Sequence, residues 1–211
     1  PDSDNYSIEV PQNYEPTAKP SFTAIENMLT TRRYESIPNR GLTTATAKAY
    51  GILDTPEKTY FSYYGADSAT IPIAAKVRLP DKQFSTVGEW KEAQLFGQQL
   101  FTGGGKYVTI FEGEYDAAAG YQMQGSKYPC VSVRNGASAA LKDCKAAYEW
   151  LDTFDAIVVC FDSDDVGQKA AREVAELFGG KSAVMKHPPQ YKDANDYLMD
   201  NNIKDFTAAF W

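Results

Sequence analysis

Acidic side chains follow three short apolar runs in the second half of the chain. In sequence order, these acids are Glu112, Asp116, Asp162, Asp164 and Asp193. Carboxylates held a few ångströms apart repel one another and raise one another's pKa, unless a cation offsets the field. Mg²⁺ prefers hard oxygen ligands and is typically held by one or two carboxylates together with substrate phosphates. If the three runs converge, the pattern predicts a divalent metal site for phosphoryl chemistry.

The apolar runs indicate why the acids should converge. They cover residues 107–111, 156–161 and 183–185, and helical lengths of chain separate them. Short strands that alternate with helices are typical of a parallel sheet, in which functional residues collect at the carboxyl ends of the strands. Asp162 and Asp164 are two residues apart on an extended strand end, so their side chains are expected to point the same way. We therefore predict an α/β fold with this acid pair as the main metal ligands.

The remaining acids are given different roles. Asp116 and Asp193 are second choices as metal ligands, and Glu112 is the candidate catalytic carboxylate, as a general base or as a further ligand. Three neighbouring acids are expected only to cap helices or to face solvent: Glu114, Asp165 and Asp196.

Turn and capping residues divide the rest of the second half into elements. Asn135 and Gly136 form a turn before a predicted helix, whose first backbone N–H groups could receive a phosphate; plain chain reversal explains the turn equally well. His187, the only histidine, lies in a proline-rich loop and is expected to be an exposed bystander. The predicted elements are a helix of about ten residues from Glu114, a strand at 130–133, a helix from Ser138 to Trp150, a helix at 166–178 capped by Asp165, a strand at 182–186, a helix from Asp193, and a helical face of Phe206, Phe210 and Trp211.

The first half carries a basic motif. Lys76 and Arg78 alternate with apolar residues, so they lie on one face of a predicted strand, and Lys82 follows after a turn. At least two of these cations are expected to meet phosphate, although a solvated strand face would show the same alternation. Other expected features are helices at 24–29 and 45–50, strands at 60–64 and 71–79, and a glycine hinge at 103–105. Arg32, Arg33 and Arg40 form a basic patch, for which a solvated surface role is favoured over contact with a nucleic-acid strand.

Composition sets further bounds. The net charge is −7, of which −1 falls in residues 1–110 and −6 in residues 111–211. Affinity for nucleic acid comes largely from cationic contacts, so any such binding should be weak and local. The three cysteines are isolated, which argues against zinc in this chain, and no apolar run is long enough to cross a membrane. Residues 1–20 contain four prolines among polar residues and are predicted to form an extended linker.

The acids lie in three motifs: FEGEYDA at 111–117, FDSDDVG at 161–167 and KDAND at 192–196. These motifs resemble those of the Toprim domain, which occurs in primases, topoisomerases and some nucleases. Three further motifs are KVRLPDK at 76–82, LFG at 95–97 and VSVRNGASAA at 131–140. With them, the chain from about Ser21 onward resembles the RNA-polymerase half of phage bifunctional primase-helicases, a group that includes the mitochondrial helicase Twinkle.

The resemblance implies a Toprim-type, mostly parallel sheet flanked by helices, preceded by a smaller α+β subdomain. The expected division is a linker at 1–20, an N-terminal primase subdomain at 21–105 and a Toprim subdomain at 106–211. The implied activity is template-directed synthesis of short RNA primers on single-stranded DNA from nucleoside triphosphates, with Mg²⁺ as the cofactor and Mn²⁺ as the alternative ion. The implied nucleotide- and template-binding residues are Lys76, Arg78, Lys82, Asn135 and Gly136.

The resemblance also implies partners. A zinc-binding module and a replicative helicase domain are expected in cis or in trans, and such a phage protein would act in the cytoplasm of its bacterial host. Without the zinc module, initiation by this chain alone is expected to be poor. Phage relatives tend to carry Lys where this chain has Gln98, a change expected to remove a cation from the cleft. Arg134 replaces a residue that is small in the family, and its role is open.

Three other functions fit parts of the pattern. A non-catalytic template-binding module of a replicative helicase is compatible with Gln98, but it does not require the intact acids. A haloacid-dehalogenase-like phosphatase also uses D-x-D after an apolar strand, but near the start of its catalytic domain, and it leaves Glu112 unexplained. A Toprim nuclease or topoisomerase would need a further domain that supplies a cleaving tyrosine.

Overall fold

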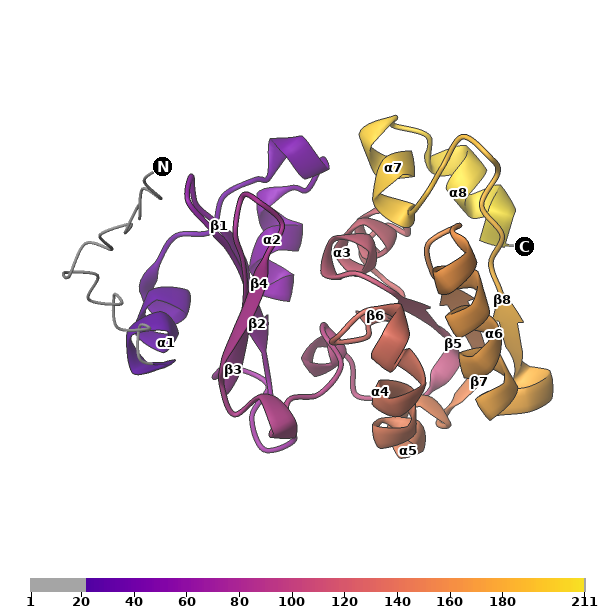
Figure 1. Cartoon of the computed structure of the whole chain (residues 1–211), viewed down its shortest axis with the longest axis horizontal. Coiled ribbons are helices and arrows are strands. Elements are labelled where there is room, and N and C mark those ends of the chain that lie inside the picture. Colours follow the sequence, from indigo (N-terminus) through magenta and orange to yellow (C-terminus); the bar gives the residue numbers. More distant parts are fainter. Residues whose placement is uncertain (1–21, 211) are drawn as a thin grey trace, which may run out of the picture.

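The computed structural model describes residues 22–210, which form two four-stranded sheets (Figure 1). The strands are β1 (Ile52–Asp54), β2 (Thr59–Tyr63), β3 (Ala74–Arg78), β4 (Phe84–Gly88), β5 (Gly105–Phe111), β6 (Cys130–Ser132), β7 (Phe154–Cys160) and β8 (Ser182–Val184). The first sheet is antiparallel in the order β1-β2-β3-β4, and the second is parallel in the order β6-β5-β7-β8. The predicted α/β fold, with a parallel sheet after a smaller α+β part, is confirmed.

Eight α-helices within the described residues cover these sheets. They are α1 (Phe22–Thr31), α2 (Thr44–Tyr50), α3 (Glu114–Met123), α4 (Ala140–Ala146), α5 (Tyr148–Leu151), α6 (Asp165–Phe178), α7 (Ala194–Met199) and α8 (Ile203–Phe210). Helix α1 contacts β3 of the first sheet, and α2 and α3 lie between the two sheets (Figure 1). On the parallel sheet, α4 and α6 cover one face, while α3, α7 and α8 cover the other. None of the helices described is long and apolar enough to span a bilayer.

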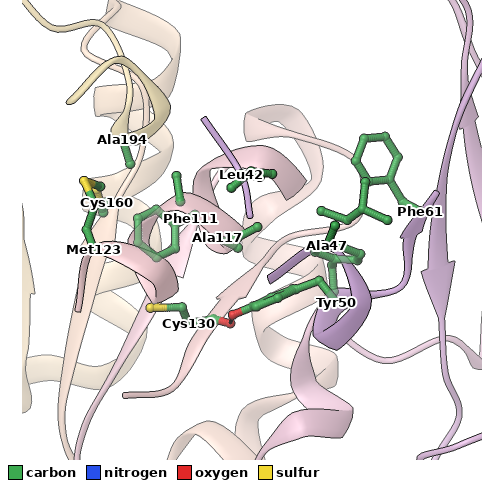
Figure 2. Packing of buried hydrophobic residues seen from close by; sticks show 14 of the residues in the cluster. Leu42, Ala47, Tyr50, Phe61, Phe111, Ala117, Met123, Cys130, Cys160 and Ala194 are labelled. Atoms are coloured by element: carbon green, nitrogen blue, oxygen red, sulfur yellow. Dashed lines mark hydrogen bonds between the residues drawn. The ribbon is translucent and has the colours of Figure 1, made fainter. Parts of the chain in front are cut away.

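One hydrophobic cluster joins the two sheets. Phe61 on β2 and Phe111 on β5 both belong to it, and both are fully buried (Figure 2). Tyr50 crosses between the halves, and its hydroxyl donates to the Cys130 carbonyl oxygen at 2.8 Å (Figure 2). Helix α3 approaches β5 closely, because Gly120 leaves room where a Cβ would lie 2.3 Å from the Phe111 ring. The shared core fixes the basic strand opposite the acidic loops, and the division near residue 105 stays a prediction.

Local signals determined some helix ends as predicted. Thr43 caps α2 by accepting from the Thr46 backbone N–H at 3.3 Å, and Gly51 ends the helix with a φ of 65°. Glycine adopts this left-handed conformation without steric cost. Helix α3 begins at Glu114 and has the predicted ten residues.

Other elements differ from the prediction. The single helix expected from Ser138 to Trp150 is wrong: a 3-10 turn at Ala137–Ala139 precedes α4 and α5, and Ser138 makes no capping hydrogen bond. Strands β1 and β4 were not predicted, because β1 has only three residues and β4 is mostly exposed. The linker at 1–20 and Trp211 lie outside the described residues.

Candidate active site

Three of the predicted acids meet at the carboxyl end of the parallel sheet. Asp162 follows β7, Asp116 lies in the first turn of α3, and Asp193 caps α7. Phe111 pairs with Cys160, so β5 and β7 end at the same level. One carboxylate oxygen from each acid lies within 4.8 Å of the other two. This all-oxygen set has the donor chemistry and spacing to hold one divalent ion.

Burial and mutual repulsion perturb the acid cluster. Burial, and then the Asp193 carboxylate, raise the pKa of Asp116 well above its ordinary value. Its Oδ1 accepts from the Asn195 backbone N–H at 2.9 Å, which ties α7 to α3. Burial also raises the pKa of Asp162, although Lys192 opposes the shift. A bound cation would offset both burial and the repulsion between these carboxylates, so the raised pKa values are consistent with metal ligands.

Glu112 lies beside this cluster at the end of β5. Its Oε2 is buried and has no hydrogen-bond partner among the described residues. A Cβ on Gly167 would lie 2.9 Å from that oxygen, so this glycine of α6 leaves the space that the carboxylate occupies. Burial, and then the Asp162 carboxylate, raise the pKa of Glu112, although the backbone N–H groups of Ala137 and Asp162 oppose the shift. An unpartnered buried acid oxygen at this position is consistent with either predicted role, proton acceptor or ligand.

Asp164 lies outside the cluster. Its Oδ1 accepts from the Gly167 backbone N–H at 2.9 Å, so Asp164 caps α6 and the cap predicted at Asp165 is wrong. The capping bond directs the Asp164 carboxylate toward the start of α6, whereas Asp162, only two residues away, belongs to the cluster. Its metal-binding role stays a prediction, and Asp116 and Asp193 occupy the positions beside Asp162.

A lysine that sequence reasoning gave no role balances part of this charge. The Lys192 Nζ lies 3.0 Å from Asp162 Oδ2 and 3.7 Å from Asp164 Oδ2. Its backbone carbonyl also accepts from the Ser163 N–H at 2.8 Å, which joins two of the acidic loops. The KDAND motif contains Lys192, but its spacing gives no sign of which acids it meets.

The basic strand faces the acids across one pocket of about 570 Å³. Lys76 and Arg78 on β3 line this active-site pocket together with the acid cluster. The Lys76 Nζ donates to Glu114 Oε1 at 2.7 Å, and the Tyr63 hydroxyl donates to the same oxygen at 2.6 Å. The expectation that Glu114 only caps a helix or faces solvent is therefore wrong: it is buried and forms an ion pair between the two halves.

Arg78 has a different environment. Its guanidinium lies 5.6 Å from the centre of the Tyr115 ring, and that of Arg40 lies 4.5 Å from the same ring. Arg40 also lines the active-site pocket and donates to Asn195 Oδ1 at 3.4 Å. The expected solvated surface role of Arg40 is thus wrong, because the fold brings this distant loop to the acidic edge.

The other residues predicted to bind nucleotide or template lie in two different pockets. Asn135 and Gly136 line the active-site pocket, and Gly136 adopts a φ of 67°. Lys82 lines a neighbouring pocket of about 380 Å³ instead, which shares Arg40, Arg78 and Tyr115 with the first.

The two departures from the family pattern lie away from the acids. Arg134 donates to both carboxylate oxygens of buried Asp143 and to the carbonyl oxygens of Trp90 and Ala93. It therefore holds the two halves together. Gln98 is buried, its Oε1 accepts from the Leu95 N–H at 3.2 Å, and it lines a different pocket. The expected effect of Gln98 on the active-site cleft is wrong.

His187 is not the exposed bystander that its proline-rich loop suggested. It is half-buried, with Nε2 3.0 Å from the Phe161 carbonyl oxygen and Nδ1 3.2 Å from the Tyr197 hydroxyl. Burial lowers the pKa of His187. The side chain therefore packs beneath the strand end that carries Asp162.

Known proteins are similar to this chain in sequence and in fold. The chain matches the Toprim-like family over residues 109–198. It is 39% identical over 182 residues to the DNA helicase/primase of Enterobacteria phage T3, and this alignment covers 85% of the chain but 32% of that relative's length.

Two solved structures from bacteriophage T7 are also similar. The primase fragment of its primase-helicase protein has a TM-score of 0.75 at 35% identity, with 85% of this chain and 75% of that chain covered. A primase domain in a complex with lagging-strand DNA polymerase and an RNA/DNA hybrid has a TM-score of 0.74 at 35% identity, with 85% and 91% covered. The acidic edge, the basic strand and these similarities together show that the chain belongs to the family of Toprim-type primase domains of phage primase-helicases.

Proposed function

We propose that this chain synthesises short RNA primers on single-stranded DNA by transferring nucleotides from nucleoside triphosphates. One observation carries the proposal: three carboxylate oxygens within 4.8 Å of one another lie in a pocket whose opposite wall is cationic. Nucleotidyl transfer needs both, because a metal must be held near a triphosphate whose charge must be offset. The pocket, at about 570 Å³, is within the range of small-molecule sites.

The acid cluster would hold the metal. Asp116, Asp162 and Asp193 supply hard oxygen ligands, which suit Mg²⁺, with Mn²⁺ as the alternative. When bound there, the ion would polarise phosphoryl oxygens and lower the pKa of a hydroxyl group. The raised pKa values of Asp116 and Asp162 support this assignment, since a nearby cation would favour their charged forms.

Glu112 would take the proton from the attacking hydroxyl. Its Oε2 has no partner in the described residues, and its pKa is raised, which brings a carboxylate closer to the pH range where a general base is most effective. The alternative role, as a further metal ligand, uses the same oxygen. Both roles require the carboxylate charge.

The cations would bind the phosphates. Arg78 has no ion-pair partner in the described part of the chain, so its guanidinium can contact a triphosphate or a strand. Lys76 is held by Glu114 and would act mainly through its fixed position on the pocket wall. Lys82 would contact the strand outside the pocket, and Asn135 and Gly136 remain proposed phosphate contacts.

The wider context is also proposed. Single-stranded DNA is the template, and a zinc-binding module and a replicative helicase domain are the expected partners, in cis or in trans. The expected location is the cytoplasm of the bacterial host. The phage T3 relative is named as a helicase/primase, and the T7 primase domains were solved with an RNA/DNA hybrid.

Dinucleotide synthesis from ATP and CTP, with and without Mg²⁺, tests the proposal. We expect product from the parent chain with Mg²⁺ and none from Asp162→Ala. Asp155→Ala is the matched control, because Asp155 is an exposed acid at the opposite end of the same strand, β7. Equal product from Asp162→Ala and its parent would remove Asp162 from the mechanism. Strand binding without product from any variant would instead favour a template-binding module.

A further inference from the structure

Phe84 occupies an unusual place for an exposed aromatic residue. It begins β4, and 52% of its surface is exposed. Of the large apolar side chains exposed in the described part of the chain, it is the one that lines the active-site pocket. A single exposed apolar residue is ordinary on a protein surface, so the informative feature is the position of this ring at the active-site pocket.

Two cations lie close to this ring. Phe84 pairs with Arg78 across β3 and β4, so both side chains project from the same face of the sheet. The Lys76 Nζ lies 4.8 Å from the ring centre, and the Arg78 guanidinium carbon lies 5.9 Å from it. Cations are attracted to the electron-rich face of an aromatic ring. The ring therefore contacts two cations, while about half of the residue stays exposed.

A second pocket adjoins the active-site pocket that Phe84 lines. The neighbouring pocket shares Arg40, Arg78 and Tyr115 with the active-site pocket, so the two lie side by side. Four cations and two acids line the neighbouring pocket: Arg40, Lys58, Arg78 and Lys82, against Asp54 and Glu57. The acid cluster lines the first pocket, and Lys82 lines only the second. An aromatic face beside cations is the combination that binds single strands without sequence preference.

We propose that Phe84 is a stacking platform for a base of single-stranded DNA, which runs from the active-site pocket over the ring into the neighbouring pocket. This inference rests on the proposed function, since it assigns the template's position in the same site. The ring would stack one base while Arg78 contacts the adjacent phosphate, so Phe84 would position the strand without taking part in the chemistry.

The test compares strands with and without bases. Fluorescence anisotropy would measure binding of an oligothymidylate and of an abasic strand of equal length, without Mg²⁺ or nucleotides. Phe84→Ala should weaken binding of the oligothymidylate by roughly tenfold and leave the abasic strand unaffected, because stacking requires a base. Phe84→Trp should retain the affinity, whereas Phe84→Leu should lose it. Ile71→Ala is the control, because Ile71 is equally exposed but lies outside both pockets.

Three results would overturn the inference. Equal weakening for both strands would mean that Phe84 acts only by orienting Lys76 and Arg78. Unchanged binding by Phe84→Ala would exclude stacking. A loss confined to nucleoside triphosphate, measured in a parallel titration, would assign the ring to the incoming nucleotide instead of the strand. This assay needs no catalysis. Base-dependent binding by a chain that makes no primer would therefore contradict the proposed function and leave the stacking role of Phe84 standing.

Discussion

The buried ion pair between the two halves gives the sharpest stability prediction. The Lys76 Nζ and Glu114 Oε1 lie 2.7 Å apart, and their side chains are only 13% and 7% exposed. Glu114→Gln would keep the shape and the acceptor oxygen, but it would leave the lysine charge without a counter-charge. Removing one partner of a buried pair costs about 3–5 kcal/mol. We expect a loss of about 3 kcal/mol, at the lower end, because the amide oxygen can still accept from Lys76 and Tyr63.

A double variant separates the charge effect from packing. Lys76→Met combined with Glu114→Gln removes both charges, and neutral replacement of a whole buried pair is often without cost. The double variant should therefore recover most of the stability that Glu114→Gln loses. Free energies of unfolding would come from urea titrations followed by tryptophan fluorescence.

An exposed pair provides the matched control. Lys169 and Glu173 on α6 lie 4.0 Å apart and are 74% and 46% exposed, so Glu173→Gln should change the unfolding free energy by less than about 0.5 kcal/mol. The reasoning is refuted if Glu114→Gln behaves like this control, or if the double variant loses as much as the two single variants together.

Three further predictions concern the residues around the acids. Burial lowers the pKa of His187 below 6.5, so the contribution of His187 to stability is present above pH 6.5 and is lost as the pH falls through the folded-state pKa. His187→Asn should therefore flatten this part of the pH profile of the unfolding free energy. An unchanged profile would contradict the role of His187. Lys192→Met should cost less than about 1 kcal/mol of stability, because Lys192 is exposed. The variant should be stabilised more by Mg²⁺ in thermal unfolding, because the acids lose their other cation. An unchanged response to Mg²⁺ would show that Lys192 does not offset the charge of the acids. Asp164→Ala should lower the free energy of unfolding in urea by about 1 kcal/mol, because the α6 cap is lost. Asp155→Ala is the control, and equal stability of the two variants would exclude the capping role.

Patterns that depend on neighbours in sequence were predictable. Helix α2 has a capping threonine at one end and a glycine at the other, and these local signals are sufficient to locate it. The apolar runs that became β5 and β7 were equally clear, because strands buried on both faces are continuously hydrophobic. Strand β4 gave no such signal, since most of its side chains face solvent.

Side-chain partners were less predictable. Asp162 and Asp164 looked equivalent because they are two residues apart, yet α6 starts directly after them and uses Asp164 as its cap. Glu114 looked like an ordinary helix-start acid, and only the packing of the first sheet against α3 brought Lys76 and Tyr63 to it.

The sequence by itself determined the parallel sheet, the order of its acidic loops and the basic strand before them, because apolar periodicity and capping chemistry act over a few residues. The tertiary structure alone decided which acids share a site, that Lys192 and Arg40 join them, and that Phe84 borders the same pocket. Those contacts link residues far apart in the chain. They depend on how the shared hydrophobic core orients the two sheets, and no local pattern encodes that orientation.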